Sequence, residues 1–140
     1  MKVCILGATG RVGSNIIKLA LKDSVEVTAL ARDSSRVEIN HERLRVIEGN
    51  VLNENDIKKA IEGSDIVISA LGTDQNGTLA KSMPQIIKKM EEEGVRKIIT
   101  IGTAGILQAR TNLNLYRFQS TESKRKSTTA AEEHLAAYKI

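Results

Sequence analysis

The most constraining feature of the sequence is a glycine-rich turn that follows a short apolar run near the N-terminus. The apolar run covers residues 3–6, and glycines stand at positions 7, 10 and 13, where a helical pattern begins. This order predicts a buried strand, a tight turn and the N-terminus of a helix. Such a turn exposes backbone N–H groups to a pyrophosphate, and the helix dipole favours that charge. We therefore predict a dinucleotide site here, with a purely structural glycine turn as the alternative.

The composition favours parallel strands that are buried on both faces. The 140 residues suit one domain, and with no Trp and one Phe the core must consist of Ile, Leu, Val and Ala. The net charge of +4 is spread along the chain and aromatic residues are few, so we do not expect nucleic-acid binding. Cys4, the only cysteine, lies in the first apolar run, where we expect a buried, inert thiol.

Nothing in the sequence predicts a membrane, export or metal-binding role. No apolar run approaches the ~20 residues that span a bilayer, and the first strand begins almost at the N-terminus, without a preceding signal peptide. We therefore expect a soluble, cytoplasmic protein that does not bind membranes. His41 and His134 are far apart and have no Cys partners, so we expect no metal site.

The periodicity of the chain predicts a doubly wound α/β (Rossmann) fold of about five parallel strands in the order 3-2-1-4-5, with helices on both faces. We expect strands at 3–6, 25–30, 44–47, 64–73 (with its exit) and 96–101, and helices at about 11–22, 53–63, 78–93 and 128–140. The helix over 11–22 should cover the sheet with Val12, Ile16, Leu19 and Ala20.

Two later segments depart from this regular pattern. Pro84 should either delay the regular helix to about Ser82 or kink an earlier turn. Residues 108–127 lack periodicity and predict a long mobile loop. Within that loop, the basic run at 124–126 fits a solvated face best, with contact to a phosphate or an acidic substrate as the minority alternative.

The residues after the second strand bear on the choice of cofactor. An acidic residue at this strand tip binds the ribose hydroxyls of NAD, whereas arginines and serines pair with the 2′-phosphate of NADP. The segment contains Arg32, Ser34, Ser35 and Arg36, and Asp33 is the counter-argument. We favour NADP over NAD, and the alternative is that both arginines are solvated loop charges.

Three further positions follow predicted strands. Asn50 would bond adenine through its amide or simply cap the turn. Ala70 and Gly72 are small where the fourth strand would pass under the cofactor, unless they form an ordinary glycine turn. Thr103 follows the fifth strand and is the hydroxyl best placed to touch the nicotinamide or the substrate, or it caps the turn.

Taken in order, these segments resemble the atypical short-chain dehydrogenases with an NAD(P)H-binding fold, the group that holds NmrA-like proteins and biliverdin IXβ and flavin reductases. The matching segments cover nearly the whole chain: 7–13, 31–36, 49–51, 70–73 and 94–99. The resemblance implies that the glycine turn holds the pyrophosphate, that Arg32 and its neighbours hold the 2′-phosphate, and that Leu71 and Gly72 contact the ribose. The cofactor set that it implies is Gly7, Thr9, Gly10, Arg11, Val12, Gly13, Arg32, Ser35, Arg36, Asn50, Val51, Ala70, Leu71, Gly72 and Thr103.

Two departures from the family qualify what the resemblance implies. Typical short-chain dehydrogenases carry a Tyr-x-x-x-Lys pair in which the lysine lowers the pKa of the phenol, but neither Tyr116 nor Tyr138 has such a lysine. Family members also continue into a substrate-binding C-terminal part, whereas this sequence ends at Ile140, so we expect a fragment or a minimal variant. We then expect either homo-oligomerisation through an exposed sheet edge or a lowered stability with fraying of the last helix.

The resemblance and these departures leave two main hypotheses. The first is an NADPH-dependent reductase of a flat, conjugated acceptor such as a flavin, quinone or tetrapyrrole, in which Thr103 orients the nicotinamide or the acceptor. The second is a non-catalytic NADP-binding sensor of the NmrA kind. An epimerase or dehydratase of a nucleotide sugar ranks last, because it needs the absent Tyr-Lys pair.

Overall fold

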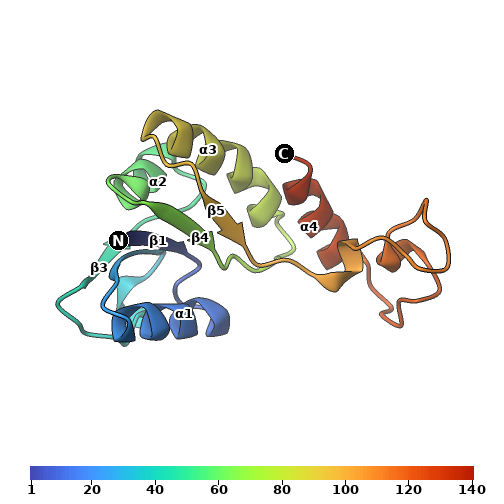
Figure 1. Cartoon of the computed structure of the whole chain (residues 1–140), viewed down its shortest axis with the longest axis horizontal. Helices are drawn as coiled ribbons and strands as arrows, with labels where there is room; N and C mark the ends of the chain where they lie inside the picture. The colour runs from blue at the N-terminus through green and yellow to red at the C-terminus, as the bar shows by residue number, and fades with distance from the viewer. The chain divides into compact units, whose positions relative to one another are not determined.

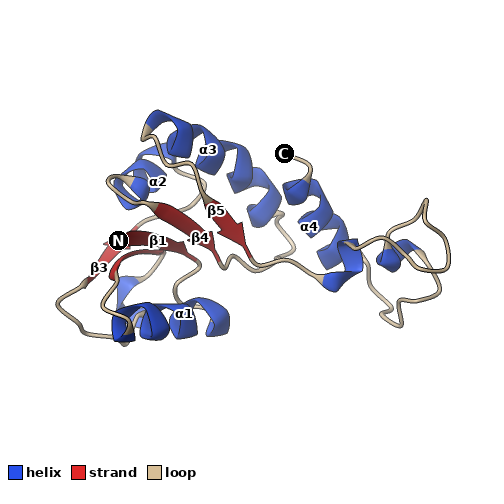
Figure 2. Cartoon of the chain, in the orientation of Figure 1, coloured by secondary structure: helices blue, strands red, loops and turns tan.

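The computed structural model describes residues 1–140, which form two compact units. The first unit contains residues 1–72 and 84–101, and the second contains residues 73–83 and 102–140. All five strands belong to the first unit, whereas the second consists of helices and loops (Figure 2). None of the helices has both the length and the apolar character that a membrane crossing requires.

The first unit is built on a parallel sheet with the strand order β3-β2-β1-β4-β5. Strands β1 and β2 are buried along nearly their whole length, as strands between two helical layers must be. The predicted fold class is therefore confirmed. The strands are β1 (Lys2–Leu6), β2 (Glu26–Ala31), β3 (Leu44–Glu48), β4 (Ile66–Ser69) and β5 (Ile98–Thr100).

The parallel register brings the carboxyl ends of the strands to one edge of the sheet. Leu6, the last residue of β1, pairs with Leu30 of β2 on one side and with Ser69 of β4 on the other. Ala31 in turn pairs with Glu48 at the end of β3. The direction of winding reverses between β1 and β4, and ligands of such sheets bind outside the strand ends at this reversal.

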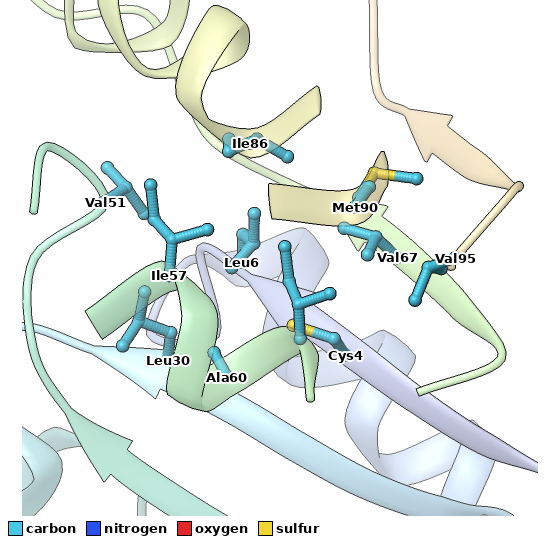
Figure 3. Close-up of a cluster of buried hydrophobic side chains, with 11 residues drawn as sticks. Cys4, Leu6, Leu30, Val51, Ile57, Ala60, Val67, Ile86, Met90 and Val95 are labelled. Atoms are coloured by element: carbon cyan, nitrogen blue, oxygen red, sulfur yellow. The ribbon is translucent and has the colours of Figure 1, made fainter. Parts of the chain in front are cut away.

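Helices cover both faces of this sheet. Helix α1 (Arg11–Lys22) lies on one face, while α2 (Glu54–Ile61) and the C-terminal part of α3 (Thr78–Glu92) lie on the other (Figure 1). Beneath α2 and α3, side chains from the sheet and both helices form one aliphatic cluster (Figure 3). Cys4 is fully buried in this cluster, and burial raises the pKa of its thiol to about 12. The predicted buried, inert thiol is confirmed.

The predicted apolar face of α1 was correct for Ile16 and Ala20, which pack against the core, and wrong for Val12 and Leu19. Val12 and Leu19 are 43% and 62% exposed, and the buried residues are Gly13, Ile17 and Leu21. The helix is oriented by its first turn, because Gly13 packs directly against the backbone of Gly7. Positions four and eight residues after Gly13 therefore face the sheet. The face predicted from the sequence pattern is therefore offset by about one residue from the face that is buried.

The second unit contains the start of α3, helix α4 (Thr129–Tyr138) and two short 3₁₀ helices, η2 (Ala104–Ile106) and η3 (Arg117–Gln119). Helix α3 begins at Thr78, so a regular start near Ser82 was wrong. Asp74 explains the earlier start, since its carboxylate accepts hydrogen bonds from the N–H and the hydroxyl of Thr78 at 3.1 and 2.6 Å. Such caps satisfy the first N–H groups of a helix.

The segment predicted as a long loop is irregular but contains its own internal bonds. A single antiparallel bridge joins Gln108 to Tyr116, and η3 follows it. The carboxylate of Glu122 accepts the backbone N–H groups of Arg110 and Thr111. Hydrogen bonds from Thr111 and Arg110 lower the pKa of Glu122, so it is held as a carboxylate. Mobility of this segment stays a prediction.

Candidate functional site

The glycine turn joins β1 to α1 at the centre of the sheet edge. Gly7 has a φ of +84°, and its carbonyl accepts the N–H of Gly10 at 3.2 Å. Gly10 is the N-cap residue of α1, and Ser14 N–H closes the first helical turn on its carbonyl at 2.9 Å. The predicted strand, turn and helix start are therefore present at these residues.

Two of the three glycines are required by the protein's own backbone. A Cβ atom on Gly7 would lie 2.6 Å from the carbonyl oxygen of Ala70, and one on Gly13 would collide with the carbonyl oxygen of Gly7. Helix, turn and β4 thus pack backbone against backbone. The turn is brought together with residues 70–71, and only Gly10 has no comparable crowding, since its nearest contact would be 3.4 Å.

The N-terminus of α1 has the properties of an anion site. No side chain caps it, and its first turn contains no acidic residue. The first N–H that donates within the helix is that of Ser14. The N–H groups of Arg11, Val12 and Gly13 therefore have no acceptor in the helix. Gly10, Arg11 and Val12 are exposed, so an anion has access to them. These residues fit a pyrophosphate.

The loop after β2 holds its acidic residue in an internal bond. Asp33 caps η1 (Ser34–Arg36), accepting the N–H of Ser35 at 3.0 Å and its hydroxyl at 2.5 Å. The Ser35 hydroxyl bond, with the backbone bond second, lowers the pKa of Asp33. Arg32 and Arg36 are exposed and form no ion pair. The Ser35 hydroxyl, which we predicted to bind the 2′-phosphate, donates to Asp33 in this structure, and its contact with a cofactor stays a prediction.

Sequence reasoning missed Glu48 as a neighbour of this loop. Its carboxylate accepts the N–H and the hydroxyl of Ser34 at 3.1 and 2.7 Å, and the hydroxyl bond is the main cause that lowers its pKa. Glu48 ends β3 and pairs with Ala31 at the end of β2. The predicted strand order 3-2 was the signal, because it places the last residues of these strands side by side.

Asn50 and Val51 follow β3 and have separate roles. The side-chain oxygen of Asn50 accepts the N–H of Leu52 at 2.9 Å, so Asn50 does cap its turn. It is exposed, and its amide nitrogen has no partner in the structure. The side chain of Val51 is buried in the cluster of Figure 3, which leaves only its backbone for a cofactor.

The segment after β4 contains the least crowded glycine of the first unit's site. Ala70 N–H donates to the carbonyl of Leu6 at 2.8 Å, and Leu71 packs against the core. Gly72 is different, since a Cβ atom there would meet nothing within 4 Å and its φ is not positive. The fold itself therefore gives no reason for a glycine at position 72.

Thr103 belongs to the second unit. Its hydroxyl oxygen accepts the N–H of Gly105 at 3.3 Å at the start of η2, so the capping role is present. The hydroxyl proton remains available for another acceptor. Thr103 also lines a cavity of about 230 Å³ within this unit.

Comparison with known proteins identifies relatives of the chain. The sequence profile of a family described as NAD(P)H-binding matches residues 7–140. YwnB of Bacillus subtilis, an uncharacterized protein, is 31% identical over 111 residues, which make up 76% of this chain and 49% of YwnB. The chain thus spans about half the length of this relative.

Solved structures share the fold over nearly the whole chain. A Bacteroides thetaiotaomicron protein provisionally named an epimerase is 28% identical, with a TM-score of 0.84 over 98% of this chain and 62% of its own. ChuY, an anaerobillin reductase of Escherichia coli O157:H7, is 20% identical, with a TM-score of 0.79 over 99% of this chain and 66% of ChuY. A short-chain dehydrogenase/reductase of Veillonella parvula in complex with NADP is 21% identical, with a TM-score of 0.78 over 99% of this chain and 62% of its own.

Proposed function

This chain belongs to the NAD(P)H-binding family, and from that premise we propose that it is an NADPH-dependent reductase of a flat, conjugated acceptor. The observation that carries the proposal is the uncapped N-terminus of α1, which follows a turn in which Gly7 packs against Ala70, just after β4, and Gly13 packs against Gly7. Gly10, Arg11 and Val12 would bind the pyrophosphate there. A bound NADPH would supply the hydride, and the protein would supply binding and orientation.

The preference for NADP rests on the loop after β2. Both nearby carboxylates, Asp33 and Glu48, already accept hydrogen bonds from serines of the loop. Arg32 and Arg36 have no such partner. Arginine pairs well with a phosphate dianion, so a 2′-phosphate would give these two guanidinium groups the charge that they lack. The solved relative that contains NADP supports this choice.

The type of acceptor is proposed from the residues around Tyr116. Four residues after Tyr116 stands Ser120, so this tyrosine lacks the lysine that lowers the pKa of the phenol in typical short-chain dehydrogenases. A flavin, quinone or tetrapyrrole can accept a hydride without a strong protein acid. ChuY, named as a reductase of anaerobillin, is a neighbour consistent with such an acceptor. The same absence disfavours an epimerase, although one neighbour carries that name.

The test is NADPH oxidation in the presence of FMN, dichlorophenolindophenol or biliverdin, followed at the nicotinamide absorbance band. NADPH binding should be measured in parallel by calorimetry. We expect oxidation to depend on protein and acceptor. As a matched variant, Thr103→Val keeps the shape of the side chain and removes the hydroxyl, so it should lower turnover by a larger factor than it lowers NADPH affinity.

The alternative is a non-catalytic NADP-binding sensor, which the missing Tyr-Lys pair also suits. Tight NADPH binding without oxidation by any of the three acceptors would reject the reductase and favour the sensor. Failure to bind either NADPH or NADH would reject both.

A further inference from the structure

The cavity of about 230 Å³ in the second unit is bounded by η2, η3 and the first turn of α4. Gly105, Ala130 and Ala131 present little side-chain volume to it, and a Cβ atom on Gly105 would lie 3.2 Å from that of Ala131. Phe118 supplies an aromatic wall. The Thr103 hydroxyl is a donor with a free proton at its edge.

The charges that line this cavity do not cancel. Glu122 is the only acidic lining residue, and it accepts two backbone N–H groups and pairs with Arg117 at 3.2 Å between Oε2 and Nε. Lys124 and Arg125 also line the cavity and form no ion pair. Two positive charges are therefore left without a partner beside a hydroxyl donor.

The size of the cavity limits what it can hold. Sites for whole small-molecule ligands measure about 300–1,000 Å³, so this cavity suits a substituent better than a three- or four-ring acceptor. We propose that it binds an anionic arm of the acceptor, a carboxylate or a phosphate monoester, through Lys124, Arg125 and Thr103. This inference rests on the proposed reductase function and names the class of acceptor.

The placement of the basic run supports the proposal. Lys124 and Arg125 line the cavity, whereas Lys126, the next residue in the same run, does not. All three residues are exposed, and they differ only in that the first two border the cavity. Lys126 therefore provides a control of equal charge from the same segment.

The experiment compares acceptors that differ only in charge, using the full chain with NADP⁺ present. FMN and riboflavin share one ring system and differ in a phosphate, and their binding is read by flavin fluorescence. Biliverdin and its dimethyl ester differ in their carboxylates, and their binding is read by absorbance. The variants are Lys124→Gln with Arg125→Gln as the double variant, and Lys126→Gln as the control.

We expect the anionic member of at least one pair to bind about tenfold tighter than its neutral partner. The double variant should lose that difference, to which each charge contributes about threefold. Binding of the neutral partner should not change in the double variant, and Lys126→Gln should leave the binding of both partners unchanged. The FMN pair distinguishes a phosphate from the carboxylates of the biliverdin pair.

The proposal is overturned if both members of each pair bind alike, if no acceptor binds, or if Lys126→Gln weakens binding as much as the double variant. These readouts need no turnover. A protein that binds the anions selectively but oxidises no NADPH would therefore contradict the reductase function and leave the anion site standing.

Discussion

The glycine turn of the first unit is formed by backbone packed on backbone, whereas the irregular segment of the second unit is ordered in part by a polar side chain that binds backbone. The turn at Gly7 packs closely against the carbonyl group of Ala70 and against the first turn of α1 at Gly13. In the second unit, the carboxylate of Glu122 accepts the N–H groups of Arg110 and Thr111. A close contact between backbones allows only glycine at that position. A carboxylate that accepts backbone N–H groups can be placed at many positions of a loop.

The difference teaches where sequence alone can locate a site. A glycine that is needed for close packing recurs at a fixed distance from a strand, so it forms a motif. Glu122 and Asp74 order their loops equally well, but they stand in polar segments without periodicity. Four substitutions or titrations would test this contrast.

The largest effect is expected for Gly13→Ala in the first unit. Its Cβ atom would collide with the carbonyl oxygen of Gly7, and that atom belongs to backbone that cannot rotate away. Overpacking against fixed backbone costs about 3 kcal/mol of unfolding free energy, and NADPH binding should be lost with it. Chemical denaturation measures the first quantity and calorimetry the second. An unchanged denaturation midpoint would contradict the backbone packing described for the turn.

The next largest effect concerns the cofactor. Arg32→Gln combined with Arg36→Gln should weaken NADPH binding by about tenfold or more, because charge-assisted bonds to the 2′-phosphate are lost. NADH lacks that phosphate, so its affinity should not change. Lys18→Gln combined with Lys22→Gln, in the second half of α1, removes the same number of charges and serves as the control. Equal losses for NADPH and NADH would return both arginines to the role of solvated loop charges.

A third substitution tests whether Gly72, unlike the glycines packed in the turn, is needed for the cofactor and not for the fold. Gly72→Ala meets nothing within 4 Å, so the free energy of unfolding should change by less than about 0.5 kcal/mol. If the ribose passes over this residue, the added methyl group should weaken NADPH binding by about fivefold. Calorimetric titration with NADPH shows whether Gly72 leaves room for the ribose of the cofactor. Unchanged affinity would remove Gly72 from the cofactor site.

The smallest effect is an acid transition in the second unit. Hydrogen bonds from Thr111 and Arg110 hold the pKa of Glu122 below its ordinary value of 4.5. Because the folded pKa is the lower one, this stabilisation is complete above pH 4.5 and is lost as the pH falls through the folded pKa. The NMR amide shifts of Arg110 and Thr111 should report the step. Glu122→Gln should abolish it, and a midpoint above 4.5 would contradict the bonds.

Most of the fold was predictable because it depends on repeated patterns. The strand order and the ranges of the helices follow from apolar runs, periodicity and turn residues. The face of α1 was not predictable in that way, because it is set by one contact between Gly13 and Gly7. Asn50 left two roles open, and only the structure showed that its side-chain oxygen caps a turn.

The candidate site was predictable in its first half and much less so in its second. Glu48 was within reach of the sequence, since the strand order places it beside the loop of Arg32. Glu122 was not, because its partners lie eleven and twelve residues before it in a segment without regular structure. For the same reason the basic run at 124–126 gave no sign that two of its members line a cavity.

The burial of Cys4 gives this protein a built-in reporter of opening. As the only cysteine, it lies in the sheet beneath α2 and α3, where its thiol is closed off from solvent (Figure 3). A pKa of about 12 leaves almost no thiolate at neutral pH, so a thiol reagent can label the chain only when this core opens. The labelling rate therefore reports openings of the first unit without an engineered cysteine, and cofactor that binds the closed state should slow it.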